Sequence, residues 1–192
     1  MGSLNPGWNE TSTDEVRNAL FKEAMMLTQK EFLSKVTGLY TSWLPARSIV
    51  EAALTPTETE EQKSAKRQKT QEGEDDVEDV DDQILILKEY CPWIDHMFEL
   101  EEEQNMVGRF KYCLFPDSSG GARIRAVPAA PGSFANRKPL PAPWRALRDD
   151  ELSQLTGIEG CVFVHNSGFI GGNKTFEGAL AMARAAIRFE EK

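Results

Sequence analysis

A long run of charged and small polar residues, from Thr55 to Asp82, constrains the fold of this chain more than any other feature of its sequence. The run contains almost no large apolar side chain, so burial cannot offset the entropy that would be lost on ordering it. We therefore predict a disordered acidic linker over 55–82. It separates a helical arm at 1–54 from an α+β domain at 83–192.

The negative charge of the chain is concentrated in this linker. The segment Glu58–Asp82 contains eleven acidic and four basic residues, whereas the formal net charge of all 192 residues is −9. The rest of the chain is therefore nearly neutral, so the acidity of the linker does not argue against binding of an anionic ligand by the folded part. The basic run Lys66–Lys69 within the linker is typical either of a nuclear localisation signal or of a solvated run of charge.

The arm has the pattern of a long helix with a broad apolar stripe. The stripe consists of Phe21, Met25, Phe32, Val36, Leu39 and Trp43. A helix of this kind is not stable alone in water, so we expect it to pack on a partner. The sequence leaves three partners open: the α+β domain, a catalytic domain, or a second copy in a homodimer. Pro45 predicts an interruption of the helix near residues 42–44.

Strand and helix patterns alternate in the domain at 83–192. The expected strands are Gln83–Leu87, Met106–Pro116, Ala122–Pro128 and Cys161–Val164, and the expected helices are Cys91–Glu103, about Asp149–Gly157 and Thr175–Phe189. The pair Gly120–Gly121 predicts a hairpin between the second and third strands. We expect an α+β fold with a small mixed sheet of about four strands, flanking helices and a long helical arm in front.

Two further observations concern surfaces and environment. Arg123 and Arg125 alternate with apolar residues in the third expected strand, so one face of that strand is basic. The three cysteines of the chain show no CxxC spacing, which indicates an intracellular, reducing compartment. No apolar run approaches the length that spans a membrane, so we expect no membrane partner.

The segment from His165 to Thr175 places a polar, glycine-rich stretch between a strand pattern and a helix pattern. It reads HNSGFIGGNKT. A glycine-rich turn before a helix exposes main-chain N–H groups that bind anions. We expect phosphate or sugar to be held by the N–H groups of Gly171 and Gly172 and by the side chains of Asn173, Lys174 and Thr175. The alternative is a connection whose glycines only permit tight turns.

Five other residues are candidates for contact with the same ligand. Ser167 and Gly168 belong to the glycine-rich stretch, and His165 precedes them at the end of a strand pattern. His165 could touch substrate or could simply be hydrogen-bonded at the strand end. Arg145 and Arg148 could extend a basic path toward an anionic ligand, or they could be solvated or form internal ion pairs.

Several separated blocks of the sequence resemble one known family, in the same order. They are LNPGWNE, SWLPARSIVEAAL, CPWIDH, PLPAPWRALRD and LTGIEGCVFVHNSGFIGGNKTFEGALAMARAAI. The family is that of the melanocyte-proliferating-gene exonucleases, in the DHH-type phosphoesterase superfamily. The likeness covers nearly the whole chain except the segment Glu58–Asp82. In the superfamily's GGGHxxAAG pattern, Gly171, Gly172 and Gly178 match glycines, whereas Asn173 stands in place of histidine.

This resemblance implies a metal-dependent 3′–5′ RNA exonuclease of the nucleus and mitochondrion. It implies that the Asp-His-His motif and a divalent metal, manganese by this likeness, belong to an N-terminal half that is absent from this chain. The chain would then contain no catalytic residue and no metal ligand. Its partners would be RNA or a nucleotide, together with that catalytic half. The alternatives are a non-catalytic nucleotide- or RNA-binding module and a protein-interaction domain.

Overall fold

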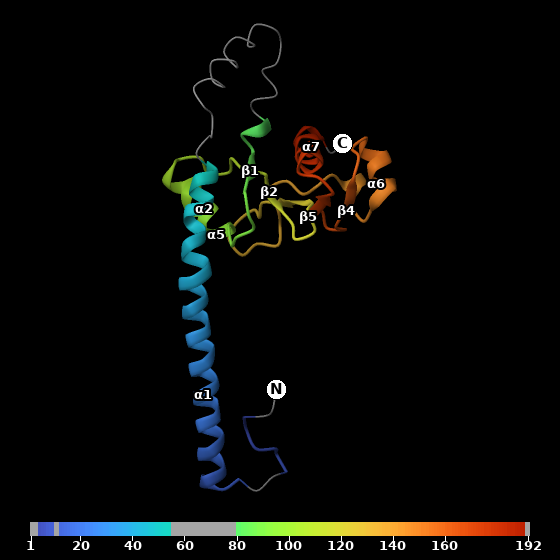
Figure 1. Cartoon of the computed structure of the whole chain (residues 1–192). Helices are drawn as coiled ribbons and strands as arrows, with labels where there is room; N and C mark the ends of the chain where they lie inside the picture. Colours follow the sequence, from blue (N-terminus) through green and yellow to red (C-terminus); the bar gives the residue numbers. More distant parts are fainter. Residues whose placement is uncertain (1–3, 10–11, 55–79, 191–192) are drawn as a thin grey trace. The chain divides into compact units, whose positions relative to one another are not determined.

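The computed structural model describes residues 4–9, 12–54 and 80–190, which belong to two compact units, Met1–Pro45 and Ala46–Lys192. The first unit is helical and the second contains a β-sheet (Figure 1). The predicted disorder of the linker and the basic run Lys66–Lys69 concern residues outside the described ranges. The predicted division into arm, linker and domain stays a prediction.

Helix α1, Asp14–Gly38, makes up most of the first unit. It begins after Thr13, whose Oγ1 accepts a hydrogen bond from the N–H of Val16 at 3.3 Å. None of its residues is buried, and the side chains of Phe21 and Phe32 are each 65% exposed. The apolar stripe predicted from the sequence therefore lies on the surface of this unit.

The helix changes its hydrogen-bonding pattern where Pro45 predicts an interruption. A π-helical turn, Leu39–Trp43, follows α1, and helix α2, Leu44–Leu54, comes next. The N–H of Leu44 donates to the carbonyl of Leu39. Because Pro45 has no N–H, it cannot donate to the carbonyl four residues earlier, and the regular α-helical ladder is broken there.

A five-stranded mixed sheet forms the centre of the second unit. Its strands are β1 (Ile84–Ile86), β2 (Tyr112–Pro116), β3 (Ala122–Ala126), β4 (Cys161–Val164) and β5 (Ile170–Asn173). They lie in the order β1-β2-β3-β5-β4, with β1 and β2 parallel and every other neighbouring pair antiparallel. The predicted α+β fold class is confirmed, and so is the hairpin that joins β2 to β3. The strand missing from the prediction is β5.

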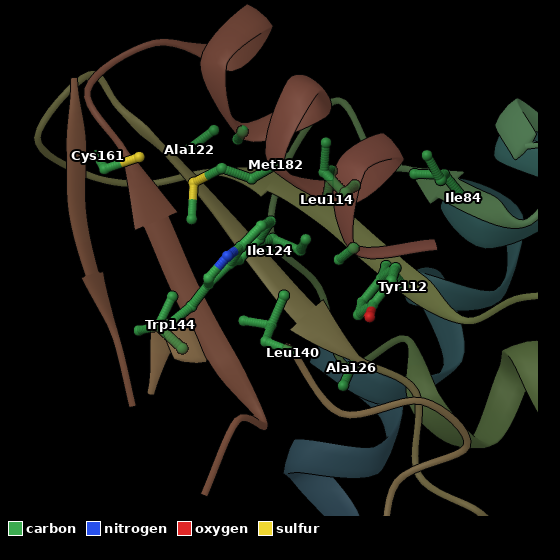
Figure 2. Close-up of a cluster of buried hydrophobic side chains, with 14 of the residues drawn as sticks. Ile84, Tyr112, Leu114, Ala122, Ile124, Ala126, Leu140, Trp144, Cys161 and Met182 are labelled. Atoms are coloured by element: carbon green, nitrogen blue, oxygen red, sulfur yellow. The ribbon is translucent and has the colours of Figure 1, made fainter. Parts of the chain in front are cut away.

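Helix α7, Phe176–Arg188, covers one face of β2, β3 and β5. Its small residues Ala179, Ala183 and Ala186 are fully buried, which lets the helix approach the sheet closely. Met182 lies among them and packs toward Ile124 of β3 (Figure 2). This apolar cluster is the larger core of the unit, and it includes no charged side chain.

A second core lies on the opposite face, at the end of the sheet formed by β1 and β2. It joins Leu85 and Cys113 of the strands to α2 and to helix α5, Ile94–Glu103. Arg47 of α2 adds ion pairs to Glu99 at 3.0 Å and Glu103 at 2.6 Å. These helices cover only part of that face, so side chains of β3, β5 and β4 beyond them remain partly exposed.

A long loop and a short helix connect β3 to β4. The loop contains a 3₁₀ turn, Ala142–Trp144, and leads into helix α6, Asp149–Thr156. Gly157 ends α6 in the left-handed conformation, with φ of 70°, as the sequence predicts.

Candidate functional site

The segment Ile170–Asn173, which we predicted to be a turn, is strand β5 in the structure. Gly171 pairs with Ile124 of β3 and with Val164 of β4, and Gly172 is paired on both sides in the same way. A strand with a hydrogen-bonded neighbour on each side directs its main-chain N–H groups into the sheet. The prediction of an amide cradle for phosphate at Gly171 and Gly172 is therefore wrong.

Gly172 instead makes room for a side chain that crosses β5. It pairs with Arg123 of β3 and with Phe163 of β4, so it lies between these two residues in the sheet. A Cβ atom on Gly172 would come within 2.6 Å of Nη1 of Arg123. The guanidinium carbon of Arg123 lies 5.1 Å from the centre of the Phe163 ring. The absence of a side chain at Gly172 thus allows a cation–π contact between two strands that are not neighbours.

The residues that follow β5 organise the start of α7. Asn173 is 1% exposed; its Nδ2 donates to the carbonyl of Glu159 at 2.9 Å, and its Oδ1 accepts from the N–H of Thr175 at 3.0 Å. Thr175 in turn accepts from the N–H of Gly178 at 3.0 Å. The amide of Asn173, expected to contact phosphate, is therefore engaged inside the protein. Lys174 is exposed at this end of the strand.

Four predicted site residues come together at the other end of β5: three from the loop that joins β4 to β5, and Arg145 from the loop that precedes α6. Nδ1 of His165 lies 3.0 Å from Oγ of Ser167 and accepts the N–H of the same residue at 3.2 Å. Gly168 has φ of 72°, and a Cβ atom there would lie 2.8 Å from Nε of Arg145. Arg145 Nε also donates to the carbonyl of Leu140 at 2.9 Å. His165, Ser167, Gly168 and Arg145 thus form one group, which the length of β5 separates from Lys174 and Thr175.

The face of the sheet opposite α7 collects positive charge. Strand alternation places Arg123 and Arg125 on this face, because Ile124 between them is buried under α7. Arg148 bridges Phe163 on the side of β4 away from β5, and its guanidinium carbon lies 6.0 Å from the ring centre. His165 joins the same face, because its N–H donates to the carbonyl of Ile170 and Ile170 pairs with Arg125. We call this set the basic face: Arg123, Arg125, Arg148, Phe163 and His165.

Asp117 fixes one edge of the basic face. Its Oδ1 accepts the side-chain O–H of Ser119 at 2.6 Å and the N–H groups of Ser119 and Gly121, while its Oδ2 pairs with Arg123 at 2.8 Å. The hydrogen bond from the Ser119 side chain, followed by the other N–H donors and Arg123, lowers the pKa of Asp117. The carboxylate is therefore charged at neutral pH and holds Arg123 over Gly172.

Arg125 and Arg148 are available for an incoming anion. Among the described residues, Arg125 has no carboxylate within ion-pair distance, and Arg148 is 69% exposed with Asp149 at 4.0 Å. Arginines around a flat ring on a sheet suit single-stranded nucleic acid, since the guanidinium groups reach phosphates and bases stack on rings or guanidinium planes. The sequence indicated Arg123 and Arg125 as a basic strand face and Arg148 as part of a basic path. It gave no sign of Phe163, which the pairing of β4 with β5 brings beside Arg123 and an isolated bridge joins to Arg148.

Neither a metal site nor a membrane span is found in the part of the chain that the structure describes. Within residues 4–9, 12–54 and 80–190, no group of three or more His, Cys, Asp or Glu residues is placed to hold a metal ion. None of the described helices combines the length and apolar character needed to cross a bilayer. The expected location of the metal in another half of the protein stays a prediction.

Comparison with known proteins identifies the family. Residues 1–187 match the model MYG1_exonuc, whose description is "Uncharacterised protein family (UPF0160)". The chain belongs to the MYG1 exonuclease family. No solved structure matches the chain.

Members of the MYG1 exonuclease family share much of this sequence. The chain is 48% identical to the MYG1 protein of Dictyostelium discoideum over 183 residues, which cover 95% of this chain and 50% of that protein. It is 44% identical to the MYG1 exonuclease of Rattus norvegicus, over 97% of this chain and 44% of the relative. It is also 44% identical to the MYG1 exonuclease of Homo sapiens, over 97% of this chain and 45% of that protein. The chain thus spans about half the length of the curated relatives it matches.

Proposed function

We propose that this chain is the substrate-positioning part of a metal-dependent 3′–5′ RNA exonuclease and that it holds single-stranded RNA on the basic face. One observation carries the proposal: the arginine–aromatic arrangement of Arg123, Phe163 and Arg148 on a partly exposed sheet face. The exonuclease name of the relatives supports the class of reaction. The chain spans about half the length of its relatives, and in this proposal the other half is a catalytic part of the DHH type that lies N-terminal to this chain.

The residues of the basic face bind and orient the strand in this proposal. Arg125 and Arg148 neutralise consecutive phosphates, and Arg123, held by Asp117 and Phe163, provides a guanidinium plane on which a base stacks. His165 and Ser167 lie at the edge of the face and contact the sugar or phosphate of the next nucleotide. A divalent metal, bound by the other half, would supply the activated water. Positioning of the substrate alone contributes strongly to such a rate.

The test is binding of a labelled single-stranded oligoribonucleotide to the chain, measured by fluorescence anisotropy over a range of salt concentrations. The double variant Arg125→Ala/Arg148→Ala removes two phosphate contacts and leaves the Arg123–Asp117 pair intact. We expect its affinity to fall at least about tenfold and its salt dependence to become shallower by about two charges.

Arg188→Ala is the matched control, because Arg188 is an exposed arginine on α7, which covers the other face. It removes the same kind of charge and should retain affinity. The proposal fails if the double variant binds RNA as tightly as the unchanged chain, or if Arg188→Ala weakens binding as much as the removal of one basic-face arginine.

A further inference from the structure

A concave site lies between the C-terminal end of α7 and the loop that follows β3. It is a pocket of about 570 Å³, a volume in the range of small-molecule sites. Its wall includes Lys111, Arg137, Lys138, Pro139, Phe189 and Glu190. No residue of the basic face lines this pocket, so it is a separate site.

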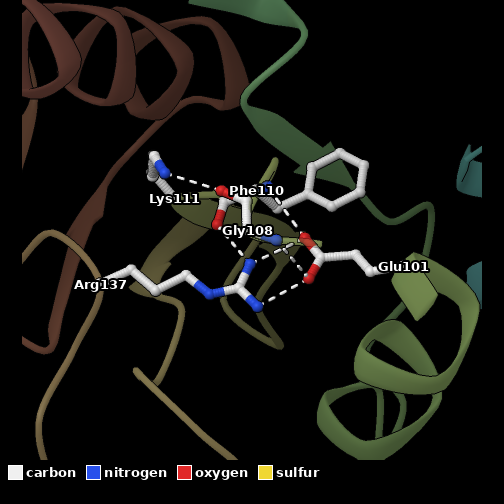
Figure 3. A network of polar contacts seen from close by, with 5 residues as sticks. All are labelled: Glu101, Gly108, Phe110, Lys111 and Arg137. Atoms are coloured by element: carbon white, nitrogen blue, oxygen red, sulfur yellow. Dashed lines mark hydrogen bonds and ion pairs between the residues drawn. The ribbon is translucent and has the colours of Figure 1, made fainter. Parts of the chain in front are cut away.

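Arg137 is a fixed positive charge in the wall of this pocket. Its two terminal nitrogens pair with the two carboxylate oxygens of Glu101, at 2.7 and 2.6 Å, and it also donates to the carbonyl of Phe110 (Figure 3). Glu101 is fully buried and accepts two more hydrogen bonds, from the N–H groups of Gly108 and Phe110. A bidentate pair of this kind sets the orientation of the guanidinium group before any ligand arrives.

Two lysines bring further donors to the same wall. Nζ of Lys111 donates to the carbonyl of Gly108 at 2.7 Å, and Nζ of Lys138 donates to the carbonyls of Ile187 and Phe189 at the end of α7. An ammonium group has three N–H bonds, so Lys111 keeps two donors and Lys138 keeps one. Arg137 likewise keeps its Nε–H. These four donors belong to partly buried residues that line one cavity.

The lining of the pocket carries more positive than negative charge. Three cationic residues line it, and Glu190, which is exposed, is the one acidic residue among the described lining residues. Glu101 compensates Arg137 from behind, which leaves the two lysines against Glu190. A partly desolvated excess of positive charge favours an anionic ligand.

The rest of the wall is apolar and includes an aromatic ring. Pro139, Pro141 and Ala186 provide flat aliphatic surface, and Phe189 provides a ring on which a planar group can stack. Inorganic phosphate alone would fill only a small part of the volume. We propose that this pocket binds a nucleoside monophosphate, with its phosphate at Lys111 and Lys138 and its base against Phe189. This inference stands on the pocket and does not require the basic face to bind RNA.

The experiment is titration calorimetry of the chain with uridine 5′-monophosphate, with uridine and inorganic phosphate as separate arms. We expect saturable binding of the monophosphate. Uridine and inorganic phosphate should each bind at least about tenfold more weakly, because uridine lacks the phosphate and inorganic phosphate lacks the base. Lys111→Gln should weaken monophosphate binding about tenfold. It removes the charge but keeps a donor for the carbonyl of Gly108.

Two further variants make the result decisive. Lys174→Gln, the same change at an exposed lysine far from the pocket, should bind as the unchanged chain does. Phe189→Ala should weaken binding of the monophosphate without changing that of inorganic phosphate, and it decides the matter if Lys111→Gln does not fold. The proposal is overturned by absence of saturable binding at millimolar ligand, by equal affinity for inorganic phosphate, or by equal losses in Lys111→Gln and Lys174→Gln.

Discussion

The two faces of the sheet use the same strands for different purposes. On the α7 face, Ile124 and Met182 are fully buried in a cluster without charge. On the opposite face, Arg123 and Arg125 of the same strand β3 are partly exposed beside Phe163. Adjacent residues of one strand thus serve stability and ligand contact. Stability and ligand binding should therefore be separable by mutation.

The largest expected effect tests the buried face. Met182→Ala removes a side chain from the core between α7 and β3 and should lower the free energy of unfolding by about 2–5 kcal/mol. Arg125→Ala, on the other face, should change it by less than about 1 kcal/mol. Urea denaturation followed by circular dichroism measures both. Equal costs for the two variants would show that the faces do not divide stability and binding in this way.

A matched pair of glycine variants gives the next largest effect and sharpens the comparison. A Cβ atom on Gly171 points to the α7 face, 3.0 Å from the main-chain oxygen of Phe163, which cannot move easily. A Cβ atom on Gly172 would instead meet the flexible guanidinium end of the Arg123 side chain. We expect Gly171→Ala to cost about 1–3 kcal/mol of stability. Gly172→Ala should cost less, but it should lower RNA affinity because Arg123 is displaced from Phe163.

Urea denaturation and RNA anisotropy, applied to both variants, complete this test. Unchanged RNA affinity in Gly172→Ala would show that the contact of Arg123 with Phe163 across β5 does not contribute to RNA binding. A Gly171→Ala protein of unchanged stability would contradict the tight packing on the α7 face.

The smallest expected effect concerns pH and the edge of the basic face. Since hydrogen bonds from Ser119 and the charge of Arg123 lower the pKa of Asp117, the folded state binds a proton there less readily than the unfolded chain. The stability that ionised Asp117 adds to the folded state is therefore fully present above the ordinary carboxyl pKa. It is lost as pH falls through the lower pKa that Asp117 has in the folded state. The stability difference between the unchanged protein and Asp117→Asn should shrink steadily over this acidic range. Ser119→Ala, which removes the first cause of the shift, should show an intermediate dependence; a difference independent of pH would contradict the assignment.

Local signals in the sequence were sufficient for most elements of the second unit. Gly120–Gly121 marked the β2–β3 hairpin, Gly157 marked the end of α6, and the apolar spacing marked α7. Each of these depends on interactions between residues close in the chain, which is why the prediction succeeded.

Strand β5 has no local signal in the sequence that predicts it. Its sequence, IGGN, has two glycines, which weaken a strand, and its extended form is fixed by pairing with β3 and β4. The absence of β5 from the prediction also explains why the predicted amide cradle at Gly171 and Gly172 is wrong. Once these residues are a strand, their N–H groups belong to the sheet, and Gly172 serves the approach of Arg123 to Phe163. That contact depends on the register of three strands, which no spacing in the sequence reports.

The order of strands in the sheet has a consequence for how the molecule assembles. The hairpin of β4 and β5 joins the sheet through β5 and β3, and the long loop and α6 separate it from β3 in the chain. Because this pairing joins residues far apart in the sequence, we expect it to form late in folding. Until that step, β3 carries an unpaired backbone edge, which invites pairing with another chain. Docking of this hairpin therefore covers the backbone edge of β3 and leaves β4 as the outer strand on that side of the sheet.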